Sequence, residues 1–345
     1  MLKLENPNIN TAKDGISVVI CAWNEIDNLK ELIPIILAQD YPLFEIVVVD
    51  DRSKDGTFDY LLEQSIYNSK IKFRHISQTP DHLSPKKYAL TLGIRAAKYD
   101  ILLLTDADCR PQSNQWIASM NEALSHDKSI VLGFSPYFKT KGFLNAFIRY
   151  ETFITVLNYF SLAIIGKPYM GVGRNLMYRK DVFIQNKGFA KHTNVLGGDD
   201  DLFMNDVANT SNTTICLQPD SYVYSFPKLT WREWYRQKTR HLSVGKYYKL
   251  GNKIRLGIMA ITQFAIWFLL PSLIVLYYTK PYFCIAIGLM FLLRLVAQWL
   301  VLNAINFRMK ATVHPFYFPI GDFFMAVYYL IMGGRNIFAK KLKKW

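Results

Sequence analysis

The chain has 345 residues, of which 51% are hydrophobic, and 41 lysines and arginines against 27 aspartates and glutamates give a formal net charge of +14. This length allows one large domain or two ordinary ones, and so apolar a composition excludes a disordered chain. The four cysteines, at positions 21, 109, 216 and 284, show neither a CxxC pair nor metal-ligand spacing. We therefore expect them to be reduced and buried.

The positive charge is concentrated beside apolar segments. Nine lysines or arginines and one acid, Glu233, lie between Lys228 and Arg255, and the last six residues, KKLKKW, contain four lysines. This placement favours a membrane surface with anionic lipids over nucleic acid as the partner, and no nucleic-acid-binding motif is present in the sequence.

Strands and helices are predicted to alternate from Ile16 to about Ser135. Near-continuous Val/Ile/Leu strands that alternate with helices are typical of a parallel sheet covered on both faces. Ser84 is the expected N-cap of one helix, with Pro85 at its first position. The predicted strands are ISVVI, EIVVVD, IKFRHI, ILLLTD and SIVLGFS, and the predicted helices run from Asn28 to Gln39 and after Thr57, Ser84 and Asn114.

Residues 141–166 are long, apolar and aromatic, but Arg149 and Glu151 interrupt them. Two interpretations are equally good. The segment is either an amphipathic helix on the membrane surface or a core helix of the preceding domain.

The last third of the chain predicts a membrane region. Residues 256–278 carry no charge and residues 282–302 carry one, Arg294, and their lengths match a bilayer core. Basic residues before and after this hairpin place both its ends in the cytosol. The polar first fifteen residues lack a signal peptide, so the N-terminus is also expected there. A third stretch, 316–332, contains Asp322 and is predicted to be re-entrant or interfacial rather than spanning.

Three acidic clusters are the best candidates for a functional site. Asp50 and Asp51 end one predicted strand, Asp106 and Asp108 end another, and Asp199, Asp200 and Asp201 form a triplet further on. The carboxyl ends of parallel strands are where such sheets bind ligands. An extended DxD would send Asp106 and Asp108 to the same side, one toward a ribose and the other toward a divalent cation that bridges a diphosphate. Crowding in the triplet can raise one pKa and create a general base, although the triplet could equally serve a metal or cap a helix.

Three further segments accompany these clusters. The loop from Ala22 to Glu25 follows the first strand, a position that often touches a nucleotide. The stretch GKPYMGVGRNLMYRK is typical of a glycine-rich acceptor loop rather than a dinucleotide fingerprint. In WREWYRQKTRHLS, Gln237, Arg240 and His241 share one helical face, where an arginine could neutralise a departing diphosphate.

In this order the motifs resemble the membrane-bound, inverting family-2 glycosyltransferases, the group that includes cellulose synthase-like and hyaluronan synthase-like enzymes, over roughly residues 14–255. The resemblance implies an α/β fold of the GT-A type, a Rossmann-like nucleotide-sugar domain with a mainly parallel sheet, followed by transmembrane helices. It divides the chain into a catalytic domain at 1–225, a basic amphipathic segment with a QxxRH motif at 226–255, and a membrane region at 256–345.

The resemblance also implies roles for single residues. The nucleotide would contact Ala22, Glu25, Asp51, Lys86, Asp106, Gln237 and Arg240, and Asp108 would hold Mg²⁺ or Mn²⁺ on the diphosphate. The acidic motif that supplies the base falls on Asp199 or Asp200, of which we favour Asp199. The family's usual Glu-Asp pair is replaced by Gly198-Asp199 or by Asp199-Asp200, depending on whether Leu202 or Phe203 takes the apolar position three residues after the base. Asp201, Trp234 and His241 are candidates for the acceptor side. His241 stands where the family has tryptophan, which argues against a long polymer product.

The sequence thus predicts a metal-dependent hexosyltransferase of polysaccharide or glycolipid biosynthesis. It would be a multi-pass protein of the plasma or inner membrane, would use a nucleotide-diphosphate sugar, and would act on a lipid-linked or glycan acceptor at the cytosolic face, with a possible membrane protein partner. The alternative is a non-catalytic membrane protein that binds nucleotide sugars as a sensor or partner subunit, which would need neither a base nor Arg240.

Overall fold

A computed structural model describes residues 14–81, 83–125 and 127–338. It divides into two compact units: one runs to Phe138 and resumes from Val156 to Phe226, and the other comprises Lys139–Thr155 and the chain from Pro227 onward. The second unit thus combines a helical segment from the middle of the chain with its C-terminal part. The predictions for the first residues and for the lysine-rich tail, 340–345, lie outside the described residues.

The first unit is built on a seven-stranded sheet in the order β3-β2-β1-β4-β7-β6-β8. Only β7 runs antiparallel to its neighbours, so the predicted mainly parallel α/β sheet is confirmed. Strands β5, β7, β8 and β9 were not predicted. The strands are β1 (Ile16–Ala22), β2 (Phe44–Asp51), β3 (Ile71–Ile76), β4 (Ile101–Asp106), β6 (Ile130–Leu132), β7 (Leu176–Arg179) and β8 (Thr213–Ile215), and a separate pair consists of β5 (Cys109–Pro111) and β9 (Val223–Ser225).

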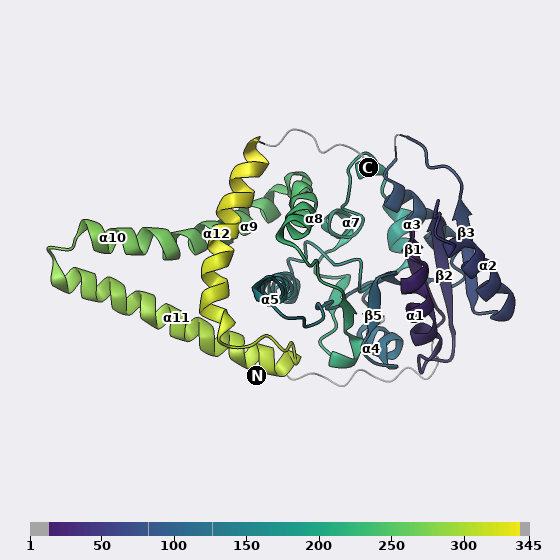
Figure 1. The fold of residues 1–345 in the computed structure, drawn as a ribbon, viewed down its shortest axis with the longest axis horizontal. Coiled ribbons are helices and arrows are strands. Elements are labelled where there is room, and N and C mark those ends of the chain that lie inside the picture. The colour runs from purple at the N-terminus through teal and green to yellow at the C-terminus, as the bar shows by residue number, and fades with distance from the viewer. Residues whose placement is uncertain (1–13, 82, 126, 339–345) are drawn as a thin grey trace. The chain divides into compact units, whose positions relative to one another are not determined.

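Helices cover both faces of this sheet, which explains why its central strands are apolar throughout (Figure 1). One face packs against α1 (Ile26–Leu37), α2 (Thr57–Tyr67) and α4 (Trp116–Ala123), and the other against α3 (Pro85–Ala96). Gly93 lets α3 approach closely, since a Cβ there would lie 2.8 Å from a Val19 methyl carbon. The unit is completed by α6 (Lys180–Gln185) and α7 (Asp201–Val207).

Some local predictions need correction. α1 begins at Ile26, two residues earlier than predicted, and Asn28 lies inside it and donates from Nδ2 to Glu25 Oε2 at 2.6 Å. Ser84 and Pro85 do start α3, although the Ser84 hydroxyl makes no capping hydrogen bond. All four cysteines are free, but only Cys109 and Cys216 are buried, and the other two are half-buried.

The helix α5 (Phe143–Ile164) contributes its first part to the second unit and the rest to the first. Many of its apolar side chains are buried, Phe147 and Phe153 among them, which favours the core-helix interpretation of residues 141–166. In the second unit, Glu151 on α5 forms an ion pair with Lys238 on α8 (Trp231–Ser243), a helix that starts with a capping box made by Thr230 and Glu233.

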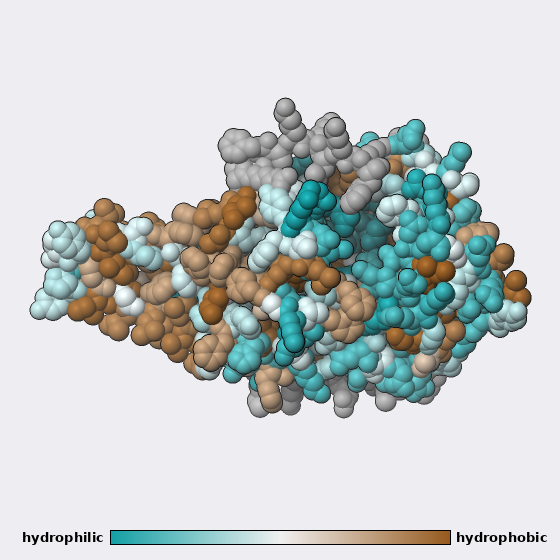
Figure 2. Space-filling model, viewed as in Figure 1, coloured by the Kyte–Doolittle hydropathy of each residue, from teal (hydrophilic) through white to brown (hydrophobic). Residues whose placement is uncertain are grey.

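Two helical segments of the second unit are long and apolar enough to cross a bilayer, by length and composition. The first is Leu250–Leu276, in which α9 (Leu250–Phe264) and α10 (Leu270–Leu276) are joined by a π-helical turn, and the second is α11 (Pro281–Met309). Pro271 accounts for the π turn, since it has no N–H for the helix ladder. Apolar side chains dominate the surface of this hairpin in Figure 2.

The third apolar stretch forms α12 (Tyr317–Phe338), which runs across the hairpin (Figure 1). It does not belong to the two candidate spans. Asp322 on α12 is 2% exposed and accepts hydrogen bonds from four side chains of the hairpin. These are Gln263, Trp267, Gln298 and Arg294, the last of which is also its ion-pair partner. The one charge of the second predicted span therefore faces a partner helix.

We predict that Asp322→Ala lowers the free energy of unfolding by about 3 kcal/mol, because it leaves the Arg294 charge and two amide groups without their acceptor. Thermal unfolding of the detergent-extracted protein measures this. The double variant Asp322→Leu, Arg294→Leu should recover much of the loss, since it removes both charges. Equal melting of Asp322→Ala and wild type would show that the pair does not hold α12.

Candidate active site

The register of the central strands brings two of the acidic clusters to one edge of the sheet. Asp106 ends β4 opposite Cys21 of β1, and Ala22 of β1 lies opposite Asp50 of β2. The carboxyl ends of these parallel strands thus carry Ala22, Asp50, Asp51 and Asp106 side by side, as the sequence predicted. Ligands of open α/β sheets bind at this kind of edge.

Asp50 and Asp51 have different surroundings. Asp50 is fully buried, accepts the backbone N–H of Ser53, and has one carboxylate oxygen 2.7 Å from Nδ1 of His75, within hydrogen-bond distance. Asp51 pairs with its neighbour Arg52, Nε to Oδ1 at 2.7 Å, and accepts a hydrogen bond from the Thr79 hydroxyl. Asp50 therefore shapes the turn, and Asp51 stays the candidate for a ligand.

Sequence reasoning missed His75. The one available signal was its place near the end of the predicted strand IKFRHI, where the sheet register sets it directly opposite Asp50.

The Asp106–Asp108 motif is not extended, which corrects the prediction. β4 ends at Asp106, and Ala107 and Asp108 form a turn before β5. The alternation of side chains along a strand therefore does not apply to the pair. Both charges nevertheless act on Glu25: burial raises the pKa of the Glu25 carboxyl, and Asp108 and Asp106 raise it further. The three carboxylates thus belong to one electrostatic neighbourhood that a cation would stabilise.

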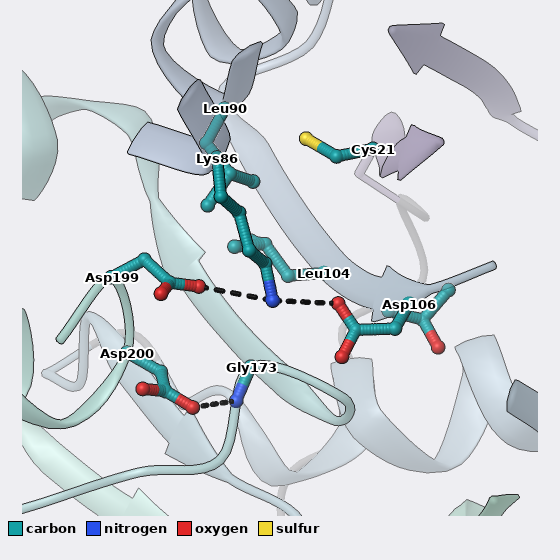
Figure 3. A pocket seen from close by; sticks show the side chains of 9 residues that line it. Cys21, Lys86, Leu90, Leu104, Asp106, Gly173, Asp199 and Asp200 are labelled. Carbon is teal, nitrogen blue, oxygen red and sulfur yellow. Dashed lines mark hydrogen bonds and ion pairs between the residues drawn. The ribbon is translucent and has the colours of Figure 1, made fainter. Parts of the chain in front are cut away.

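Lys86 sits between two of the acidic segments (Figure 3). Its Nζ lies 3.0 Å from Oδ1 of Asp106 and 3.2 Å from Oδ2 of Asp199. Burial works against the charge of this ammonium group, but Asp106, Asp199 and Asp200 outweigh it and raise the pKa of Lys86 well above its usual value. The lysine stays charged and joins the strand edge to the segment before α7.

The aspartate triplet divides into three roles. Burial alone would raise the pKa of Asp199, but Lys86 lowers it below its ordinary value. Burial and the neighbouring charge of Asp199 raise the pKa of Asp200. The two Asp200 oxygens already accept backbone N–H groups, from Gly173 at 2.8 Å and Asp201 at 2.7 Å, and Asp200 is the N-cap of α7. Asp201 accepts the N–H of Leu202.

A small pocket lies among these groups (Figure 3). Its polar lining comes from Lys86, Thr105, Asp106, Asp199 and Asp200, and its apolar lining from Cys21, Leu90, Leu104 and Gly173. The pocket contains a fixed ammonium group beside carboxylates, which is the chemistry needed to bind a phosphoryl oxygen and a sugar hydroxyl together.

The part of the chain that the structure describes contains no group of three or more His, Cys, Asp or Glu side chains arranged to hold a metal ion. A magnesium-type ion does not need one. It is commonly bound by one or two carboxylates, with substrate phosphates and water as its other ligands. The acidic neighbourhood of Asp106, Asp108 and Glu25 fits such a site.

The residues of the QxxRH motif lie on α8, in the second unit. Gln237, Arg240 and His241 share one face of the helix by their spacing. Trp234 is 4% exposed and packs against Phe147 and Tyr328. Its burial favours a packing role over the acceptor contact that the sequence suggested.

The comparisons with known proteins agree with this geometry. Residues 17–186 match the sequence model of the family described as Glycosyl transferase family 2. The matched segment is thus similar to a family-2 glycosyltransferase domain over about half of the chain. This domain contains the strand edge, Lys86 and the glycine-rich loop, and the aspartate triplet follows it.

Two curated proteins are similar to part of this chain. The glycosyltransferase AglE of Haloferax volcanii is 27% identical over 186 residues, which are 53% of this chain and 58% of AglE. The chondroitin synthase of Pasteurella multocida is 32% identical over 133 residues, 38% of this chain and 13% of the synthase. The chain thus aligns with little more than half of the first relative and a small part of the second.

A solved structure extends the likeness to nearly the whole fold. The mannosyltransferase PcManGT from Pyrobaculum calidifontis, in complex with GDP-Man and Mn²⁺, has a TM-score of 0.61 and 18% identity, covering 96% of this chain and 89% of that chain. At this identity the likeness concerns the fold, and it confirms the predicted GT-A type with a C-terminal helical region.

We predict that Lys86→Met lowers the free energy of unfolding by about 1–2 kcal/mol at neutral pH, less than a fully buried ion pair because the Lys86 side chain is 44% exposed. Without the lysine, burial raises the pKa of Asp199 above its unfolded value. The folded state then binds protons more readily than the unfolded state, so the deficit should shrink as the pH falls through that raised pKa.

Thermal unfolding of wild type and variant across this pH range measures the effect. Lys86→Arg is the matched control, since it keeps the charge and should keep most of the stability. A deficit that is the same at every pH would show that Lys86 stabilises the protein by packing rather than by its charge.

Proposed function

We propose that this chain is an inverting glycosyltransferase that moves a sugar from a nucleotide-diphosphate sugar to a hydroxyl of a lipid-linked or glycan acceptor. The observation that carries the proposal is the bridge of Lys86 between Asp106 and Asp199 at the carboxyl edge of a family-2 domain. Lys86 thus links Asp106, at a strand end suited to binding a donor, with Asp199, a carboxylate suited to contacting an acceptor.

The donor side is assigned to the strand ends. Asp51 and Ala22 would contact the nucleotide, Asp106 the ribose, and Glu25 would lie beside them, since all four belong to β1, β2, β4 or the loop after β1. Asp108 would hold Mg²⁺ or Mn²⁺, with phosphate oxygens as further ligands. When bound, the ion would stabilise the charge that develops on the diphosphate. Lys86 would then exchange one carboxylate partner for a phosphoryl oxygen.

We assign the general base to Asp199. Lys86 keeps this carboxyl ionised at neutral pH despite its burial, so it can accept a proton, although its lowered pKa makes it a weaker base than the raised pKa makes Asp200. Asp200 is the weaker candidate because both its oxygens are occupied by backbone N–H groups. We therefore give Asp200 a positioning role, in which it fixes the start of α7 and the loop at Gly173.

The reaction would be a single displacement. The acceptor oxygen attacks the anomeric carbon while its proton passes to Asp199, and the bond from that carbon to the phosphate oxygen breaks. The nucleoside diphosphate leaves with the bonding electron pair. One such displacement inverts the configuration at the anomeric carbon.

The membrane assignment rests on the two candidate spans and the basic segments that flank them. We propose that the hairpin anchors the enzyme in the plasma or inner membrane with its catalytic domain on the cytosolic side. A lipid-linked acceptor suits an active site held close to a bilayer. Gln237 and Arg240 keep the role that the family resemblance implies, contact with the departing diphosphate, and His241 and Asp201 remain candidates for the acceptor side.

We predict that the membrane-extracted protein releases a nucleoside diphosphate from at least one member of a panel of nucleotide sugars, and that this requires Mg²⁺ or Mn²⁺. A chelator should stop the release, and either ion should restore it. Asp108→Ala should lose both the activity and its response to metal.

The competing function is that of a non-catalytic sensor or partner subunit that binds nucleotide sugars. Binding of a nucleotide sugar without release of the diphosphate, in the presence of membrane lipids and metal, would favour it. Unchanged metal-dependent turnover by Asp108→Ala would instead remove the metal role from that residue and leave the transferase in place.

We predict that Asp199→Asn lowers kcat by about 10²–10⁴-fold, because an amide cannot take the proton, while affinity for the nucleoside diphosphate stays close to that of wild type. Asp200→Asn should cost about tenfold or less, since asparagine also caps helices. Steady-state kinetics and nucleotide binding measure both. A larger loss in Asp200→Asn than in Asp199→Asn would transfer the base role to Asp200.

A further inference from the structure

The glycine-rich segment before β7 presents one arginine at the tip of a tight turn. The Asn175 N–H donates to the Val172 carbonyl at 2.9 Å, which closes a turn with Gly173 and Arg174 at its centre. Sequence reasoning assigned this segment to the acceptor but gave Arg174 no role. Turns of this kind hold their central side chains at defined positions when both ends are anchored.

Both ends of this turn are anchored. On one side the Gly173 N–H donates to the Asp200 carboxylate (Figure 3). On the other, the fully buried Asn175 side chain donates at 2.8 Å to the carbonyls of both Phe134 and Ser221, and its oxygen accepts from the Trp116 indole. The turn therefore has little freedom to move, and Arg174 starts from a fixed backbone.

The guanidinium of Arg174 is held in place but not fully satisfied. Its Cζ lies 4.4 Å from the centre of the Tyr137 ring, and Nη2 donates to the Ser135 carbonyl at 3.2 Å. Its other terminal nitrogen, Nη1, is buried and has no hydrogen-bond partner among the described residues. Buried polar groups of folded proteins are nearly always paired, so an unpaired guanidinium nitrogen indicates a missing oxygen.

Arg174 lies next to the pocket between the donor and acceptor sides, because its neighbour Gly173 lines that pocket together with Asp106 and Asp199. Burial works against the positive charge of Arg174, but Tyr137, Cys109, Asp108 and Asp106 together raise the pKa of the guanidinium. Arg174 thus shares its neighbourhood with both aspartates of the Asp106–Asp108 motif, and through Gly173 it is linked to Asp200. It lies at the junction of the donor and acceptor sides.

We propose that Arg174 is a substrate-binding residue whose Nη1 donates to a phosphoryl oxygen, either of the donor diphosphate or of a phosphate on a lipid-linked acceptor. The inference rests on the proposed function and deepens it. A planar guanidinium fixed by Tyr137 and Ser135 is suited to phosphate, because its donors match the spacing of phosphoryl oxygens. A neutral sugar hydroxyl would not need a charge in this place.

The test compares Arg174→Gln with wild type in the full-length, detergent-extracted protein. We expect kcat/KM to fall by about 10- to 100-fold, the usual cost of losing a hydrogen bond to a charged group. Arg179→Gln is the matched control: Arg179 lies on the same strand-and-turn segment but pairs with Ile101 at the opposite end of β4. Arg179→Gln should leave the KM for the donor and the KM for the acceptor within about twofold of wild type.

Two sets of probes separate the sources of the phosphate. If the donor diphosphate is the ligand, inhibition by the released nucleoside diphosphate and by inorganic pyrophosphate should weaken in Arg174→Gln. If the acceptor phosphate is the ligand, inhibition by the nucleoside diphosphate and by pyrophosphate should stay unchanged. The preference for a polyprenyl phosphate over the corresponding free polyprenol should then be lost. A structural role would lower stability without such a selective change.

Wild-type behaviour separates the two proposals. Wild type that releases no nucleoside diphosphate from any donor would contradict the proposed function. Active wild type together with an Arg174→Gln variant of equal kcat/KM and equal probe selectivity would overturn this inference alone. If Arg174→Gln melts below the assay temperature, Arg174→Lys takes its place, with an expected loss of about tenfold because lysine lacks the planar fork; wild-type kinetics from the lysine variant would overturn the inference.

Discussion

Lys86 places one positive charge between two carboxylates from distant parts of the chain, Asp106 at the end of β4 and Asp199 ahead of α7. Several acids meet at this edge of the sheet, and their repulsion in a partly buried setting would otherwise raise their pKa values or separate the segments. The ammonium group allows Asp199 to stay ionised. The carboxylate proposed as base and the strand end proposed for the donor therefore depend on the same cation.

The second unit also pairs a buried carboxylate with a cation, here among apolar helices. Asp322 introduces a carboxylate among helices whose surfaces are mostly hydrophobic, and Arg294 neutralises it while three neutral side chains complete its hydrogen bonds. Unpaired, either charge would be costly among apolar side chains. Paired, they fix the point where α12 crosses the hairpin. In both units, charged side chains from distant segments can pack together because each charge is neutralised by an opposite one.

Much of the first unit could be predicted because its signals are local. Runs such as VVIC and IVVV are apolar on both faces, and only strands covered on both sides tolerate that pattern. The errors in predicting single elements have local causes. The helix predicted from Asn28 begins two residues earlier, and the Asn28 amide donates to the Glu25 carboxylate. Asp108 was placed on an extended strand, although the chain turns after Asp106 to begin β5. β7 has only four residues and no alternation to reveal it.

The amino-acid sequence alone determined the type of fold, the two long apolar helical segments and the positions of the acidic clusters, because propensity, periodicity and strand-end placement are properties of neighbouring residues. Only the tertiary structure decided which of these groups meet. The pairing of Lys86 with Asp199, of His75 with Asp50 and of Arg294 with Asp322 joins residues 25 to 113 positions apart. Such contacts depend on how strands align and helices cross, and no local pattern encodes that. For the same reason, the sequence shows a uniform triplet and does not distinguish Asp199 from Asp200. In the structure, Asp199 pairs with Lys86, and Asp200 accepts backbone N–H groups.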